Sequence, residues 1–134
     1  AYQPQNSRSQ FQRTDKNQLI LDAYNANPSS MKLALESLDD IAHPNKLAIL
    51  GEMKEGGENS AQEHKAMLDF CQEKKIPCIT VGQLFEDHNT EMRMAHFNST
   101  PELVEYLKSN TQKDRLILVK ASRSVGLEKI VPLL

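Results

Sequence analysis

Hydrophobic positions along this 134-residue chain change their spacing repeatedly, and the changes predict strands that alternate with helices. Short apolar runs predict strands at 18–23, 46–50, 76–81 and 116–119, with a weaker strand at 93–97. Apolar residues at three- and four-residue spacing predict helices at 28–41, 60–75 and 124–134, and a short helical piece at 83–88. A further helix is expected with Thr100 as its cap and Pro101 at its first position.

Strands that alternate with helices are typical of βαβ units, whose right-handed crossovers produce a mainly parallel sheet. We therefore predict the α/β class, and within it a Rossmann-like, three-layer α/β/α domain. Residues 2–16 are rich in Gln, Ser, Asn and Arg and contain few apolar positions, which predicts an extended arm. The chain thus divides into an arm at 1–17 and one domain at 18–134.

The composition narrows the classes of partner. Lys and Arg total 16 against 18 Asp and Glu, without a basic stripe, so nucleic acid is not an expected partner. No apolar run approaches the roughly 18–20 residues that a membrane span needs. We interpret the two cysteines, Cys71 and Cys78, as buried free thiols of a cytosolic protein, with a disulfide or a metal pair as the alternative.

The first candidate site follows the strand at 18–23, where Asp22, Tyr24, Asn25 and Asn27 crowd one turn. Ligands of open α/β sheets bind at the carboxyl ends of the strands, and the start of the next helix suits an anion. The alternative is an ordinary turn with a helix cap, which accounts fully for Asn27 but not for the other three residues. We therefore expect a ligand at this turn.

Two further polar clusters follow later strands. Residues 51–57 contain three glycines and precede His64, although a lone histidine is more often a satisfied core or surface residue than a ligand. Lys120, Ser122 and Arg123 follow the last strand and suit a carboxylate or phosphate, with solvated charge as the alternative. The chain lacks G-x-x-x-x-G-K-[ST], G-x-S-x-G and any obvious metal-ligand spacing. We expect it to hold part of a ligand without performing the chemistry alone.

Four segments of the sequence resemble the C-terminal domain of the Mur ligase family. They are Asn6-Ser7-Arg8, Asp22-Ala23-Tyr24-Asn25-Ala26-Asn27-Pro28-Ser29-Ser30-Met31, Leu50-Gly51-Glu52-Met53 with the downstream His64, and Leu118-Val119-Lys120-Ala121-Ser122-Arg123. The segments occur in the family's order and span nearly the whole chain. Glu52 and Ala121 depart from the Asp and Gly that are usual in the family, and both departures are mild.

The resemblance implies one part of a three-domain, cytoplasmic, ATP-dependent ligase of peptidoglycan synthesis. Such enzymes use ATP and Mg²⁺ to convert a peptide carboxylate into an acyl phosphate, which an amine attacks to form an amide. The branch of the family that this chain resembles most joins D-Ala-D-Ala to UDP-MurNAc-tripeptide. The expected partners are then the two substrates and the upstream N-terminal and central domains, with the arm at 1–17 entering from the central domain. Neither ATP nor Mg²⁺ is expected to be bound to this fragment, which we expect to be inactive alone.

For the nucleotide, the resemblance assigns residues at the first turn and in the arm. Arg8 matches the hinge arginine that reaches an ATP phosphate in the closed enzyme, where a guanidinium suits a bidentate contact. Asp22 matches the acid that contacts the ribose. Tyr24, Asn25 and Asn27 line the same nucleotide-facing turn.

For the dipeptide, the resemblance assigns Lys120, Ser122 and Arg123, because the free carboxylate of D-Ala-D-Ala needs a cation. His64 matches a motif position without an assigned role, and no metal ligand is assigned to this domain. Two other functions stay open. One is a non-catalytic, Rossmann-like binding module, and the other is a domain of a sister Mur-type or folylpolyglutamate ligase that uses a different amino acid.

Overall fold

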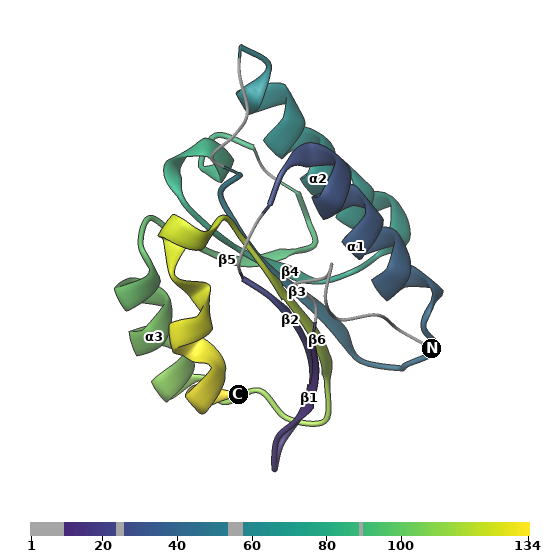
Figure 1. Ribbon diagram of the computed structural model, residues 1–134, viewed down its shortest axis with the longest axis vertical. Coiled ribbons are helices and arrows are strands. Elements are labelled where there is room, and N and C mark those ends of the chain that lie inside the picture. The colour runs from purple at the N-terminus through teal and green to yellow at the C-terminus, as the bar shows by residue number, and fades with distance from the viewer. Residues whose placement is uncertain (1–9, 24–25, 54–57, 89) are drawn as a thin grey trace.

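The computed structural model describes residues 10–23, 26–53, 58–88 and 90–134. Its six strands form one sheet in the order β1-β2-β6-β3-β4-β5, and helices cover both faces of that sheet (Figure 1). In chain order the elements, in which η denotes a 3-10 helix, are β1 (Gln10–Arg13), β2 (Gln18–Asp22), α1 (Pro28–Asp40), β3 (Lys46–Gly51), α2 (Ser60–Lys74), β4 (Cys78–Val81), η2 (Gln83–Phe85), β5 (Arg93–Phe97), α3 (Thr100–Ser109), β6 (Leu116–Lys120), η3 (Arg123–Val125) and η4 (Leu127–Leu133).

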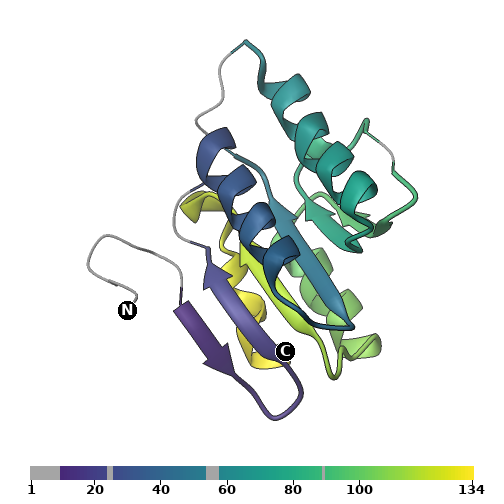
Figure 2. The same cartoon turned by 90° about the vertical axis from the view of Figure 1, so that its right-hand side faces the viewer.

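The predicted three-layer α/β/α fold is confirmed. Strands β2, β6, β3, β4 and β5 pair in parallel, and β1 alone among the described strands pairs antiparallel, with β2. Helices α1 and α2 lie on one face of the sheet, while α3 and the C-terminal 3-10 segments lie on the other (Figures 1 and 2). All the parallel strands therefore direct their carboxyl ends toward the same edge.

The apolar runs of the central strands are explained by burial on both faces. Along β6, Leu118 packs into the cluster beneath α1 and α2, which includes Leu35, whereas Val119 packs into the cluster beneath α3, which includes Leu103. All four side chains have an exposed fraction of 0%. Because successive strand residues point to opposite faces, a strand with helices on both sides needs an unbroken apolar sequence.

Strand β1 was not predicted, because residues 10–13 were assigned to an extended arm. Its backbone pairs with β2, with Phe11 opposite Ile20. Three of its four residues are exposed, and Phe11 is 69% exposed. An edge strand can be held by backbone hydrogen bonds with little apolar burial, so the hydrophobic pattern carries a weak signal for it.

The single closing helix predicted at 124–134 is wrong. The chain instead forms η3 and η4, separated by Gly126 in the left-handed region at φ 76°. Pro132 lies inside η4, where its ring prevents a regular α-helical hydrogen-bond ladder. The expected cap at Thr100 is also wrong, since α3 begins at that residue and its hydroxyl donates to the Val125 carbonyl at 2.6 Å.

Both cysteines are buried and free, as predicted. A hydrogen bond with Cys78 and burial together raise the pKa of the Cys71 thiol, which therefore stays protonated. Within the described ranges, none of the helices is both long enough and apolar enough to cross a membrane.

Candidate functional site

Residues from three separate predicted clusters meet at the carboxyl edge of the sheet. The register places Asp22 of β2 opposite Lys120 of β6, and Lys120 opposite Leu50 of β3. Gly51 of β3 lies opposite Val81 of β4. The loops that leave these strands are therefore neighbours, as binding at the ends of parallel strands requires.

Asp22 and Lys120 form a buried ion pair. The Lys120 ammonium donates to Asp22 Oδ2 at 2.6 Å, and the two residues are 1% and 7% exposed. A charge this deeply buried is stable only beside an opposite charge. The sequence-based roles placed these residues at different substrates, and the structure shows them in direct contact with each other. Whether either residue touches a ligand stays a prediction.

The segment after β6 divides into a buried and an exposed part. Ser122 is 6% exposed; its backbone N–H donates to the Glu52 carbonyl at 3.1 Å, and its hydroxyl donates to the Ala26 carbonyl at 3.4 Å. Arg123, the first residue of η3, is exposed. Ser122 therefore links the segment after β6 to Glu52 and Ala26, while Arg123 lies at the surface, and whether it touches a ligand stays a prediction.

Asn27 acts as the helix cap of α1. Its Oδ1 accepts from the Ser30 N–H at 2.9 Å, and the Ser30 hydroxyl accepts from the Asn27 N–H at 3.1 Å. This reciprocal capping box satisfies two backbone donors at the start of the helix. The cap interpretation is confirmed, and contact of Asn27 with a nucleotide stays a prediction. The other predicted nucleotide residues, Arg8, Tyr24 and Asn25, lie outside the described residues.

His64 is a fully satisfied, buried histidine on α2. Its ring has an exposed fraction of 0% and packs edge-on against Phe85, with ring centroids 4.7 Å apart. Nδ1 lies 2.7 Å from the Ser60 carbonyl, and Nε2 accepts from the Met53 N–H at 3.0 Å. Burial lowers the pKa of His64 below its ordinary value of 6.5, against a smaller opposing effect of the Ser60 hydrogen bond. The ring is therefore a neutral link between α2 and the end of β3.

Glu52 is a buried polar residue of the edge that belongs to the predicted cluster at 51–57 but had no role assigned to it. It is 8% exposed, and its Oε2 accepts from the Leu84 N–H at 2.9 Å, at the start of η2. Its side chain crosses Gly82 so closely that a Cβ there would lie 2.0 Å from Glu52 Cγ. Gly82 also has φ 118°, which glycine alone adopts easily. Gly82 directly after β4 is visible in the sequence, but the sequence does not indicate that the Glu52 side chain packs against it.

In the part of the chain that the structure describes, no group of three or more His, Cys, Asp or Glu residues is arranged to hold a metal ion. The residues at this edge provide one ion pair, one exposed arginine and several backbone donors already in use.

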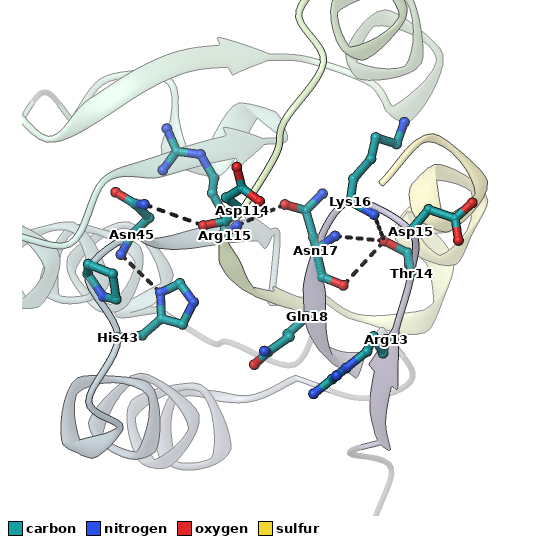
Figure 3. A pocket seen from close by; sticks show the side chains of 11 residues that line it. Arg13, Thr14, Asp15, Lys16, Asn17, Gln18, His43, Asn45, Asp114 and Arg115 are labelled. Atoms are coloured by element: carbon teal, nitrogen blue, oxygen red, sulfur yellow. Dashed lines mark hydrogen bonds between the residues drawn. The ribbon is translucent and has the colours of Figure 1, made fainter.

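A cavity of about 360 Å³ lies at the opposite edge of the sheet, where β2, β3 and β6 begin (Figure 3). Residues 13–18, 43–45 and 114–115 line it, so it contains none of the predicted site residues. Its polar groups mostly bind one another: Asn17 Oδ1 accepts from the Arg115 N–H at 3.0 Å, and the Thr14 hydroxyl accepts from the Asn17 N–H at 2.9 Å. We interpret this cavity as a junction of turns, and the carboxyl edge as the candidate site.

Comparison with known proteins identifies the family of the chain. Residues 7–123 match the family described as Mur ligase, glutamate ligase domain. The chain belongs to the Mur ligase family. The Mur ligase domain is 31% identical over 129 residues to the UDP-N-acetylmuramoyl-tripeptide–D-alanyl-D-alanine ligase of Rickettsia prowazekii, covering 92% of this chain and 29% of that protein. It is 34% identical to the ligase of the same name from Bacillus subtilis, covering 84% of this chain and 27% of that protein.

Solved structures show the same fold for the Mur ligase domain. MurF from Acinetobacter baumannii has a TM-score of 0.80 at 25% identity, covering 97% of this chain and 30% of that chain. MurF ligase from Thermotoga maritima, solved in complex with ADP, has a TM-score of 0.79 at 22% identity, covering 95% of this chain and 30% of that chain. The chain thus spans under a third of the length of these relatives.

Proposed function

We propose that this Mur ligase domain is the C-terminal part of an ATP-dependent ligase that joins D-Ala-D-Ala to UDP-MurNAc-tripeptide. The relatives that carry this name support the substrates. The observation that supports the proposal is the common edge, where the end of β2 at Asp22 and the end of β6 at Lys120 are joined by a buried ion pair. A nucleotide-side turn and an acceptor-side loop held in contact suit a domain that completes a two-substrate site.

The rest of the site then belongs to upstream N-terminal and central domains of the same cytoplasmic enzyme. The absence of G-x-x-x-x-G-K-[ST] from the sequence supports this division, because the ATP phosphates need such a loop elsewhere. Mg²⁺ would bind with that loop, outside the described part of this domain. Residues 1–17 would connect the central domain to this one, with β1 as the last part of the connection.

The proposed reaction requires this domain to protect an intermediate from water and to contact both ATP and the dipeptide. ATP transfers its γ-phosphoryl group to the tripeptide carboxylate; the amine of D-Ala-D-Ala attacks the acyl carbonyl, phosphate leaves, and the amine loses a proton. An acyl phosphate is lost if water reaches it, so closure of a domain over it protects the intermediate. In this domain, Asp22 would face the nucleotide and Arg123 would bind the free carboxylate of the dipeptide.

The exposed arginine provides the test. In the full-length parent enzyme, Arg123→Ala should raise the KM for D-Ala-D-Ala about tenfold or more, since a hydrogen bond to a charged group contributes about 1.5–3 kcal/mol. The KM for ATP should change much less. Lys129→Ala, which removes an exposed cation from η4, is the matched control and should change neither constant.

Three results would contradict the proposal. Equal rises in both KM values would remove the carboxylate-binding role of Arg123. Ligation of glutamate or another amino acid in place of D-Ala-D-Ala would indicate a sister ligase. A full-length parent without ligase activity would favour the non-catalytic binding module.

A further inference from the structure

His64 is the one residue of the family-like motifs whose role the proposed function leaves open, and its contacts specify a role. The Ser60 carbonyl can only accept a hydrogen bond, and the Met53 N–H can only donate one. The ring must therefore carry its proton on Nδ1 and present the Nε2 lone pair to Met53. Of the two contacts, the one to Ser60 stays within the first turn of α2, whereas the one to Met53 reaches the end of β3.

The backbone that His64 holds is a junction of four elements. The Glu52 N–H donates to the Val81 carbonyl at 3.1 Å, which joins β3 to β4. The Glu52 carboxylate accepts from the Leu84 N–H at 2.9 Å, which adds η2. The Glu52 carbonyl accepts from the Ser122 N–H at 3.1 Å, which adds the segment that leads into Arg123. Residues 52 and 53 therefore set the position of the loop that follows β6.

The surroundings of the ring keep this junction rigid. Met53 is 1% exposed and Phe85 is 0% exposed, so water does not compete for the hydrogen bond between Met53 and His64. Phe85, in η2, packs edge-on against the imidazole, and η2 is itself fastened to Glu52. A ring of the same shape without the Nε2 acceptor would keep the packing and leave a buried N–H unsatisfied.

The hydrogen bonds that start at Met53 reach the Ser122–Arg123 loop in fewer steps than they reach Ala26 and Asp22. From Met53 the path to Ser122 runs through the adjacent residue Glu52 and one backbone hydrogen bond. Among the hydrogen bonds of the described residues, Ala26 lies one step beyond Ser122, through the longer 3.4 Å contact with its carbonyl, and Asp22 is joined to Lys120 through their side chains. A displacement at Met53 should therefore affect the loop of Arg123 more strongly than the nucleotide-side turn.

We propose that His64 is a positioning residue for the acceptor substrate: by holding the Met53 N–H, it fixes the Glu52–Met53 backbone and through it the Ser122–Arg123 loop. The inference rests on the proposed function for the identity of that substrate, D-Ala-D-Ala. The positioning itself rests on hydrogen bonds within the described chain.

The test compares two substitutions in the full-length parent enzyme. His64→Phe keeps an aromatic ring against Phe85 and removes the acceptor, whereas His64→Gln supplies an amide oxygen in place of Nε2. His43→Phe, the same change at the opposite edge of the sheet, is the matched control. We expect His64→Phe to raise the KM for D-Ala-D-Ala about tenfold and the KM for ATP less than about threefold, with recovery in His64→Gln.

Amide hydrogen exchange of the same proteins reports the positioning without reference to the substrate. The Met53 and Ser122 amides should exchange about tenfold faster in His64→Phe than in the wild type, and at wild-type rates in His64→Gln and His43→Phe. Unchanged exchange at Met53 or Ser122 would overturn the inference, and so would equal rises in the two KM values. If the wild-type enzyme ligates no D-Ala-D-Ala while the exchange differences appear, the proposed function fails and the positioning by His64 stands.

A pH comparison covers the case in which His64→Phe does not fold. Protonated His64 donates from both nitrogens, so the wild type loses the acceptor for Met53 on acidification, whereas His64→Gln keeps it. The charged or titratable groups that act on His64 are Glu52, Glu63 and His88, and both proteins contain them. Because burial lowers the pKa of His64, the Met53 amide should lose protection relative to His64→Gln only as the pH falls below 6.5. Equal pH dependence in the two proteins would overturn the inference.

Discussion

At the scale of residues, Asp22 and Lys120 form a buried ion pair at the site edge. Both are buried, and the atoms that join them are 2.6 Å apart. Removing one partner leaves a buried charge without compensation, which typically costs about 3–5 kcal/mol. We expect Asp22→Asn and Lys120→Met each to lower the free energy of unfolding by that amount, and the double variant to lose much less than their sum.

Chemical denaturation of the four proteins in this double-mutant cycle measures the coupling. The exposed pair of Lys65 and Asp69 on α2, 3.0 Å apart, provides a control cycle, because surface pairs contribute about 0–1 kcal/mol. Additive losses at Asp22 and Lys120 would show that each residue is stabilised by other neighbours.

The sequence located these two residues next to strand ends but not beside each other. Residue 22 ends the first parallel strand and residue 120 ends the last, and nothing in the local pattern states that β2 and β6 are adjacent. Asn27 was easier to interpret, because a helix cap depends on residues only three positions away. Local chemistry was predictable at this edge, and the long-range pairing was not.

At the scale of elements, β3 and the loop after β6 approach each other closely in the site. A Cβ at Gly51 would lie 2.5 Å from the Cβ of Ala121 and 3.0 Å from Val125 Cγ1. Gly51→Ala should therefore lower stability by about 1–3 kcal/mol, because neither backbone can move without disturbing the sheet. Ala121→Gly removes the nearer of the two atoms and should recover part of that loss in the double variant.

Thermal unfolding of the three variants tests this contact. Ala121→Gly alone should cost about 1–2 kcal/mol, since it removes a buried methyl group and adds backbone freedom to the unfolded chain. If Gly51→Ala is as stable as the wild type, the two loops are more loosely packed than the distances indicate. If Ala121→Gly does not restore stability to Gly51→Ala, Val125 Cγ1 is the atom that limits the space for a Cβ at residue 51.

The two elements that sequence reasoning missed have different physical causes. Strand β1 is held by backbone pairing with β2 and is largely exposed, so its side chains give no alternating pattern. The C-terminal segment does show apolar residues at helical spacing, and Leu127 and Ile130 are indeed buried. Gly126 and Pro132 nevertheless redirect the backbone into 3-10 turns. Burial was predictable there, and the hydrogen-bond pattern was not.

At the scale of the whole molecule, the fold followed from the sequence because five parallel strands with helices between them leave few arrangements of the chain. The length and the motifs of the chain also bear on the reaction that we expect from this domain alone. It spans 29% of the Rickettsia relative and 27% of the Bacillus relative, and its sequence contains no phosphate loop of the G-x-x-x-x-G-K-[ST] type. In the proposed function, the carboxyl edge would supply recognition groups, and the phosphoryl-transfer groups would come from the other domains.

The 134-residue chain alone should therefore form no amide from ATP, UDP-MurNAc-tripeptide and D-Ala-D-Ala, whereas the full-length parent should form it. The physical reason is that one domain supplies neither a cradle for the ATP phosphates nor closure against a second surface, and an unprotected acyl phosphate reacts with water. Mass spectrometry of the product and release of inorganic phosphate measure the two steps separately. A reaction without enzyme gives the background, and the parent with Arg123→Ala gives a reference with reduced activity. Amide product from the chain alone would show that the domain contains a complete catalytic site, and the division of labour proposed here would then be wrong.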